Sequence, residues 1–230
     1  MKELSAQARL YIIITILIGV VLIVWTLFTL DWANIGLFLL AALGAVTQTL
    51  KVEGPNDKTN YNIAWFVYGF TFFLFGPGAA LFVVLIAHMG EWLWHKYPWY
   101  IQSFNIGAHC IPVFLAGLIF EKIGGDAKVL DLTGAMGMVV ANLFFILVNH
   151  LLVGVVVRLA RGQSFAESGV FDFYTLILDF TILSMGAATA LIWFYNPFAS
   201  LLNILPLYLL YNALRVPALE RQLANLINKP

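Results

Sequence analysis

Long runs of apolar residues, separated by short polar stretches, dominate the sequence. A helix needs about 20 apolar residues to cross the roughly 30 Å of hydrocarbon in a bilayer. Candidate segments are Leu10–Leu30, Trp32–Leu50, Tyr61–Phe75, Ala79–Trp94, Ile101–Phe120, Val129–Val157, Tyr174–Tyr195 and Phe198–Leu214. The third is short for a span and the sixth is long. The pattern predicts an all-α, polytopic transmembrane helical bundle with about eight membrane segments, or seven spans and one partial span.

Lys and Arg residues are concentrated in every second connection between the predicted segments. With eight spans and the N-terminus inside, the outer loops hold only Lys122 and Lys128. The inner segments hold the other ten: Lys2, Arg9, Lys51, Lys58, Lys96, Arg158, Arg161, Arg215, Arg221 and Lys229. Because inner loops of membrane proteins are enriched in Lys and Arg, we expect both termini in the cytoplasm. The chain is then a multi-pass protein of the cell (inner, cytoplasmic) membrane.

Composition points to the same surroundings. Hydrophobic residues make up 62% of the 230 residues and charged residues only 10%, against about 25% charged in soluble domains. So short a chain cannot bury that much apolar surface, and we expect lipid around it. We assign residues 1–230 to a single integral membrane domain, with a short cytoplasmic interfacial tail over residues 216–230.

Charge and cysteine content exclude several functions. A net charge of zero gives no basic field for nucleic acid. The single cysteine, Cys110, excludes an intrachain disulfide and multi-cysteine metal sites. We find no serine nucleophile elbow, Gly-rich phosphate loop or paired-glutamate protease pattern, so we expect no enzyme, and the sequence names no cofactor.

Ionisable side chains inside membrane segments are few, and by default they mark function. At about 1.5 Å per residue, all of them fall in the cytoplasmic half of the bilayer. Polar residues at helical spacing extend them into stripes on four segments, which should face one another instead of lipid. The candidate ligand-binding residues of this inner-leaflet pocket are His88, Glu91, Asn105, His109, Asn149, His150 and Asp179.

Three interpretations of these residues remain open. They can act only as interhelical hydrogen bonds, which is the simplest interpretation. They can form a pocket for a small ligand or for protons. Histidine and carboxylate side chains also suit a divalent metal, but the spacing matches no known metal signature, and we assign no metal ligands. Similarly, Gly76-Pro77-Gly78 fits a tight turn better than a broken-helix binding site, and Gly186-Ala187-Ala188 suits close helix contact.

Several short motifs follow one another between Tyr61 and Arg215. They are Phe75-Gly76-Pro77-Gly78-Ala79-Ala80, Pro98-Trp99-Tyr100, Ser103-Phe104-Asn105, Gly124-Gly125, Asn149-His150-Leu151-Leu152-Val153 and Arg158-Leu159-Ala160-Arg161-Gly162, then Pro206 and a basic exit at Arg215. In this order they resemble the multi-helix N-terminal membrane region of bacterial signalling proteins with HD-GYP, HD or GGDEF output domains. The Gly-Pro-Gly-Ala opening is more distantly similar to substrate-binding subunits of energy-coupling-factor transporters and to five-span receptor modules of histidine kinases.

The resemblance implies a compact bundle that binds a small molecule. The 15 residues after Arg215 are too few for an output domain, so we expect a sensory or small-ligand-binding module that acts through a protein partner at the cytoplasmic face. Its contacts would be the Lys51–Asn60 loop, the Arg158–Phe173 loop and the tail. The alternatives are a substrate-binding subunit of an energy-coupling-factor-type transporter and a structural or accessory subunit of a larger membrane complex.

The distribution of basic residues makes a direct prediction. Reporter fusions at Met1 and at Pro230 should both report a cytoplasmic location, because the inner segments carry nearly all Lys and Arg residues. Opposite locations for the two fusions would mean that one segment does not span, with Tyr61–Phe75 the first suspect.

Overall fold

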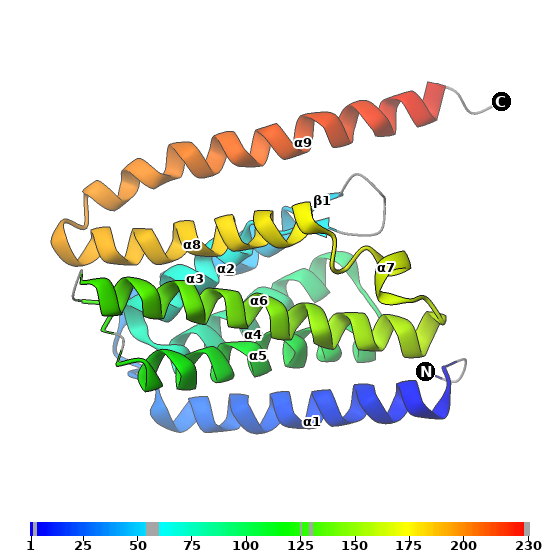
Figure 1. The fold of residues 1–230 in the computed structure, drawn as a ribbon, viewed down its shortest axis with the longest axis horizontal. Helices are drawn as coiled ribbons and strands as arrows, with labels where there is room; N and C mark the ends of the chain where they lie inside the picture. Colours follow the sequence, from blue (N-terminus) through cyan, green and yellow to red (C-terminus); the bar gives the residue numbers. More distant parts are fainter. Residues whose placement is uncertain (2–3, 54–59, 125, 129–130, 228–230) are drawn as a thin grey trace.

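The computed structural model describes residues 1, 4–53, 60–124, 126–128 and 131–227. Most of this part of the chain is helical (Figure 1). The helices are α1 (Ala6–Thr29), α2 (Ile35–Thr49), α3 (Ala64–Phe75), α4 (Pro77–His95), α5 (Trp99–Lys122), α6 (Leu132–Arg161), α7 (Phe165–Ser168), α8 (Phe173–Tyr195), η1 (Ala199–Asn203) and α9 (Ile204–Ile227). Outside the described residues lie Gly125, the predicted start of the sixth segment at Val129, and the basic residues Lys2, Lys58 and Lys229.

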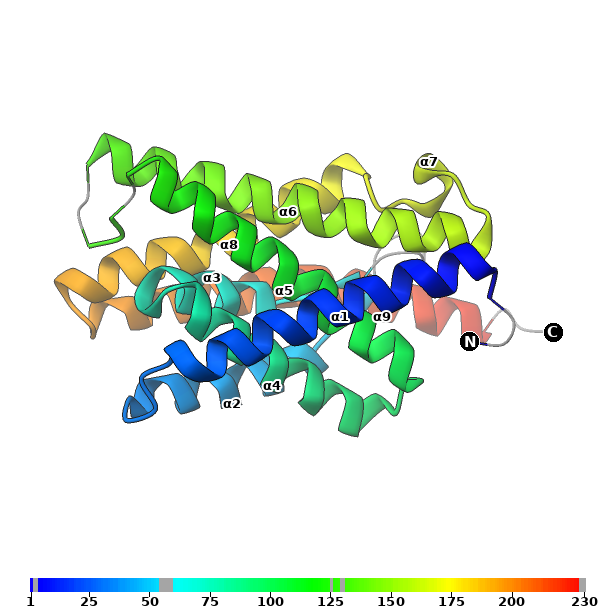
Figure 2. The same ribbon diagram turned by 90° about the horizontal axis from the view of Figure 1, so that it is seen from below.

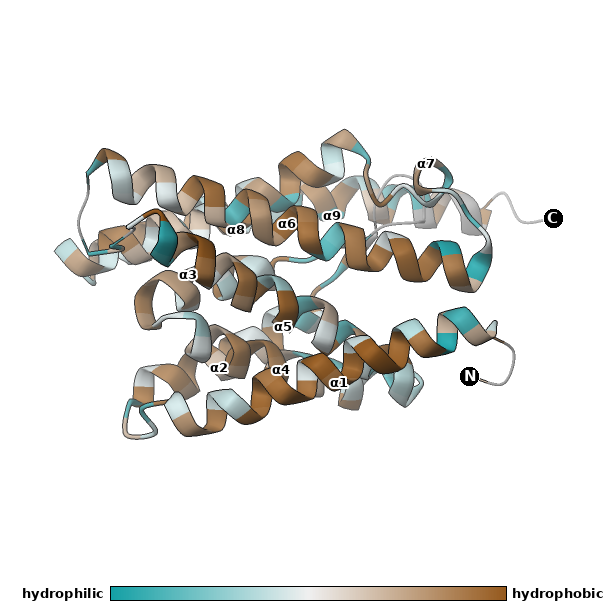
Figure 3. Ribbon diagram, turned by 60° about the horizontal axis from the view of Figure 1, so that its bottom comes forward, coloured by the Kyte–Doolittle hydropathy of each residue, from teal (hydrophilic) through white to brown (hydrophobic). Residues whose placement is uncertain are grey.

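Every predicted membrane segment overlaps an apolar helix. In the described part of the chain, six helical stretches are long and apolar enough to cross a bilayer, whereas α2 and α3 are shorter apolar helices of 15 and 12 residues. Figure 3 shows the hydrophobic residues following α1 along most of its length, with hydrophilic residues at its start. The all-α expectation is confirmed, and the chain is a multi-pass, membrane-embedded protein. How many of the eight segments cross completely stays a prediction.

The start of the third predicted segment is wrong. Tyr61 belongs to a short strand, β2 (Asn60–Tyr61), which pairs antiparallel with β1 (Val52–Glu53). Helix α3 begins only at Ala64, whose amide donates a hydrogen bond of 2.9 Å to the Asn62 side chain. The apolar run therefore includes a strand residue, which hydropathy alone does not separate from the helix.

Helix α3 lies at the centre of the bundle. It packs against α8, α4 and α2, while α1 packs on α5 and α5 on α6 (Figures 1 and 2). Every residue from Ala64 to Phe73 is buried. A helix that is hydrophobic all round belongs in an interior, and this short, aromatic-rich segment is the part of the sequence with that character.

The connections divide between two ends of the bundle. The start of α1, the β1–β2 pair, α7 and the end of α9 lie at one end, which we call the termini end (Figure 1). The α1–α2 connection, the α3–α4 connection and η1 lie at the opposite end (Figures 1 and 2). Lys122 at the end of α5 and Lys128 belong to the opposite end. The start of α1 and the end of α9 lie at the same end, as an even number of crossings requires. Which side of the membrane this end faces stays a prediction.

The described part of the predicted tail is helical, but it is not a separate helix. Helix α9 continues from Ile204 through Pro217 to Ile227 without a break. It lies along the outside of the bundle (Figure 1), and large apolar side chains such as Leu205, Leu209 and Leu223 are exposed along it. Most of the final predicted segment and the described part of the tail thus form one peripheral helix.

Glycines set the closest helix contacts. Gly69 of α3 and Gly186 of α8 lie at the α3–α8 crossing, where a Cβ at Gly69 would lie 2.5 Å from the Leu183 carbonyl oxygen. Gly76, with φ of 89°, forms the turn between α3 and α4, and Pro77 begins α4. Positive φ is accessible to glycine without strain, and these positions fit the turn and packing interpretations.

We predict that Gly186→Ala destabilises the bundle. The new Cβ would overlap the Phe66 carbonyl oxygen, and overpacking a tight contact costs about 1–3 kcal/mol. Thermal unfolding in mild detergent should show the loss. Gly78→Ala is the control, because its Cβ would meet only the Thr29 hydroxyl at 3.3 Å. Equal stability of the two variants would show that α3 and α8 do not pack as described.

Candidate functional site

A cavity of about 240 Å³ opens between the helices near the termini end. Its walls come from the end of α2, the β2–α3 segment, and helices α4, α5, α6 and α8. The residues that line it are Gln48, Lys51, Asn60, Asn62, Trp65, His88, Asn105, His109, Asn149, His150, Val153, Val170, Thr175 and Asp179. Six of the seven candidate residues predicted from the sequence therefore face one space, and the seventh, Glu91, lies directly behind its wall.

Glu91 is the centre of a buried hydrogen-bond network. Its Oε2 accepts hydrogen bonds from Gln48 Nε2 at 3.0 Å and Gln102 Nε2 at 3.1 Å, and lies 3.1 Å from His88 Nδ1. Its Oε1 forms an ion pair with Lys51 Nζ. The Glu91 side chain is 0% exposed and that of Lys51 is 23% exposed. An unpaired carboxylate at this depth would be severely destabilising, and the network supplies its counter-charge and donors.

Gln48 extends the network to α3. Its Oε1 accepts hydrogen bonds from Asn62 Nδ2 at 2.6 Å and from the Tyr68 hydroxyl at 2.8 Å. With its Nε2 on Glu91, both ends of this amide are occupied. One side chain thus links α2, α3 and α4, and fixes the orientation of the carboxylate.

Two histidines continue the network toward the cavity. His109 Nδ1 lies 2.8 Å from the Asn105 carbonyl oxygen and 3.2 Å from His88 Nε2. A carbonyl oxygen only accepts, so His109 Nδ1 carries the proton and His88 Nε2 can share it. His88 Nδ1 then donates to Glu91. In the part of the chain that the structure describes, His109 Nε2 has no protein partner.

A second pair, His150 and Asp179, lines the other side of the cavity. His150 Nε2 lies 2.9 Å from Asp179 Oδ2, and His150 Nδ1 donates to the Val170 carbonyl oxygen at 2.5 Å. The Trp65 ring contacts both histidine groups, with its centroid 5.8 Å from that of His109 and 6.2 Å from that of His150. The two ionisable clusters therefore share one aromatic wall.

Some polar groups in the cavity wall have no partner within the described part of the chain. Asn149 Nδ2 donates to the Ala108 carbonyl oxygen at 2.8 Å, whereas its Oδ1 accepts no hydrogen bond from these residues. Among the same residues, neither the Asn105 side-chain amide nor the Trp65 indole N–H has a hydrogen bond. Because buried polar groups normally have a partner, these groups and His109 Nε2 are suited to a bound molecule or to water.

At the termini end of the network, the Tyr97 ring packs against Lys51. Lys51 Nζ lies 5.9 Å from the centre of the Tyr97 ring, in the connection between α4 and α5. Burial raises the pKa of the Tyr97 hydroxyl above its ordinary value, and the Glu91 charge raises it further. Tyr97 therefore stays neutral at physiological pH and covers the Lys51–Glu91 pair without adding charge.

Most of the predicted site residues line the cavity, but the side chains that hold them in place were not predicted. Gln48, Lys51, Asn62 and Tyr68 were not among the predicted site residues, although all four contact the network. A glutamine near the end of an apolar segment was the available signal for Gln48. Among the described residues, no group of three or more His, Cys, Asp or Glu side chains is arranged to hold a metal ion. Asn142, on the α6 face of Asn149, lies away from this cavity and donates to Ser184 Oγ at 3.3 Å.

Fold and site together define a class: a multi-pass membrane protein with a buried, hydrogen-bonded polar cavity. No protein-family model, curated protein or solved structure matches the chain. The resemblance to bacterial signalling proteins therefore stays an expectation, and the chemistry of the cavity carries the functional argument.

We predict that Lys51→Met destabilises the protein more than the double variant Lys51→Met/Glu91→Gln. Removing one partner of a buried ion pair leaves an uncompensated charge, at a cost of about 3 kcal/mol. Lys51 is partly exposed, so the stability lost on its removal should lie at the lower end of the range for buried ion pairs. The neutral amide that Glu91→Gln introduces needs no counter-charge, so the double variant should recover most of the stability.

Unfolding of both variants in the same detergent gives the comparison, and Lys122→Met, on an exposed lysine at the opposite end, is the control. A double variant less stable than Lys51→Met would contradict an ion pair between the two side chains.

Proposed function

We propose that this chain is a membrane-embedded sensory module, which binds a small polar molecule in the cavity and acts through a protein partner at the cytoplasmic face. The supporting observation is the convergence of His88, His109, His150 and Asp179 around one space near one end of the bundle. Interhelical hydrogen bonds alone would not require a cavity. The proposal includes no catalytic step by the chain itself.

The size of the cavity limits the ligand. Sites for drug-sized ligands measure about 300–1,000 Å³, and this cavity of about 240 Å³ is smaller. The carboxylates of Glu91 and Asp179 are already engaged by Lys51 and by His150. The groups without a partner among the described residues are amides, an indole N–H and an imidazole nitrogen. They suit a small molecule that both donates and accepts hydrogen bonds and that carries little net charge.

The position of the cavity supports communication with a partner. Its wall includes Asn60 of β2 and Val170, which follows α7, and both belong to connections at the termini end. A ligand that contacts these residues can change the surface that a partner would bind. The distribution of Lys and Arg supports a cytoplasmic location for this end, in the cell membrane.

We predict that the native protein, purified in mild detergent, carries a small polar molecule that Asn105→Ala fails to retain. The Asn105 side chain makes no hydrogen bond to the described part of the chain, so its removal should reduce ligand retention without lowering stability. His109→Ala should also lose the molecule, because it removes the Nε2 that faces the cavity. Mass spectrometry of the extracted small molecules measures retention, and the unfolding temperature measures stability.

His95→Ala is the matched histidine control, since His95 is exposed and lies outside the cavity wall. It should retain as much of the molecule as the native protein. Equal retention by Asn105→Ala and His109→Ala, or a native protein that carries no small molecule, would leave the residues with a structural role only.

A further inference from the structure

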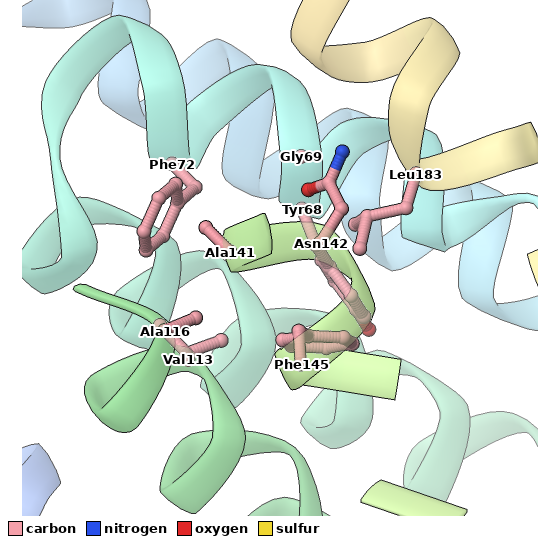
Figure 4. A pocket seen from close by; sticks show the side chains of 9 residues that line it. All are labelled: Tyr68, Gly69, Phe72, Val113, Ala116, Ala141, Asn142, Phe145 and Leu183. Atoms are coloured by element: carbon pink, nitrogen blue, oxygen red, sulfur yellow. The ribbon is translucent and has the colours of Figure 1, made fainter. Parts of the chain in front are cut away.

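Three of the voids among the described residues lie at successive levels of the bundle. The polar cavity near the termini end is the first. A central void of about 10 Å³ is lined by Tyr68, Gly69, Phe72, Val113, Ala116, Ala141, Asn142, Phe145 and Leu183 (Figure 4). A third cavity, of about 530 Å³, lies toward the opposite end and is lined by Trp25, Phe72, Phe73, Leu74, Phe75, Gly76, Pro77, Phe114, Gly117, Leu118, Phe120, Glu121, Asp126, Ala127, Lys128 and Phe194. We call these the polar cavity, the central void and the aromatic cavity.

The same helices line the voids in the same order. On α5, Asn105 and His109 face the polar cavity, Val113 and Ala116 the central void, and Gly117 and Phe120 the aromatic cavity. On α8, the corresponding residues are Thr175 and Asp179, then Leu183, then Phe194. A helix rises about 1.5 Å per residue, so the voids are stacked along the bundle.

Two rings on one face of α3 separate the voids. Tyr68 lines the central void, and its hydroxyl donates to Gln48 in the wall of the polar cavity. Phe72, one turn further on, lines both the central void and the aromatic cavity. Residues four apart share a helix face. Phe72 therefore separates the central void from the aromatic cavity, and Tyr68 lies between the central void and Gln48 in the wall of the polar cavity.

The central void is too small for a solute, although the surrounding side chains do not fill it completely. A volume of about 10 Å³ is close to the minimum for a single water molecule. Three small residues, Gly69, Ala116 and Ala141, surround it together with the larger rings (Figure 4). Displacement of the Phe72 ring would join the central void to the aromatic cavity, with no change in the helix backbones.

We propose that the polar cavity, the central void and the aromatic cavity form one transport path for a small uncharged polar solute, closed in this structure by Tyr68 and Phe72. The proposal rests on the proposed function only in taking the polar cavity as the binding site. It adds passage across the bundle to binding at one end.

The chemistry of the path favours a neutral solute. Among the described residues, Asn142 is the one side-chain amide that lines the central void, where its Nδ2 donates to Ser184 and its Oδ1 has no partner. No charged side chain from the same part of the chain lines this void. An ion there would lose its hydration without compensation, whereas an uncharged polar molecule can accept the single amide contact. The aromatic cavity beyond offers ring faces that suit a planar or apolar surface.

Flux through proteoliposomes tests the path. Tyr68→Ala/Phe72→Ala, which removes both rings, should raise the permeability to urea and glycerol several-fold over that of the native protein, as measured by light scattering after osmotic shock. Sodium and chloride permeability, measured in the same vesicles, should stay unchanged. Tyr68→Ala/Phe70→Ala is the matched control, since Phe70 and Phe72 are both in α3 and are 8% exposed, but Phe70 lines none of the three voids. This control should give native permeability, because Phe72 still closes the path.

A second variant provides the same test in case the first variant does not fold. Tyr68→Leu/Phe72→Leu replaces both α3 rings of the central void by smaller apolar side chains, and should raise urea permeability too. Native urea permeability in both folded variants would overturn the path, as would a rise that Tyr68→Ala/Phe70→Ala shares or that sodium shares. Retention of a small molecule in the polar cavity is measured separately. If the variants keep native permeability while the native protein retains a ligand, the path is overturned and the proposed function stands. If permeability rises but no ligand is retained, the path stands and the proposed function is overturned.

Discussion

The burial of the Glu91 carboxylate constrains how the surrounding helices can pack. A charged group with no exposure must be matched by a counter-charge and by donors. Lys51, Gln48, His88 and Gln102 supply them from the segments around α2, α4 and α5. Because each of these side chains must reach one carboxylate, the helices that carry them are held in register, and the cavity forms beside the place where they meet.

The cavity combines satisfied and unsatisfied groups, and this combination carries the functional argument. Glu91 and Asp179 are paired, so the site has little net charge. The groups left without a partner in the described part of the chain, at Asn105, Asn149, Trp65 and His109, belong to the wall itself. Satisfied networks make the wall rigid, and free hydrogen-bonding groups make it a binding surface. A sensory module needs both properties, and so does the entrance of a transport path.

Much of the fold was predictable because hydropathy reports directly on contact with lipid. The apolar segments, the all-α class and the turn at Gly76-Pro77 all follow from composition along the chain. The convergence of His88, His109, His150 and Asp179 was predictable from helical depth, since lipid disfavours polar stripes. Lys51 was not, because it follows the end of α2 and resembles an ordinary loop lysine until the fold places it on Glu91. The strand at Tyr61 and the continuity of α9 through Pro217 also depend on tertiary context.

One hydrogen-bonded network connects Glu91 to the cavity through His88 and His109. Nitrogen-15 NMR of the imidazoles, in native protein and in Glu91→Gln, tests it most directly. We expect a protonated Nδ1 and an unprotonated Nε2 for His109. Glu91→Gln should shift the signals of both His88 and His109, while the signals of exposed His95 stay the same. A His109 signal that does not respond to the loss of the Glu91 charge would contradict the account.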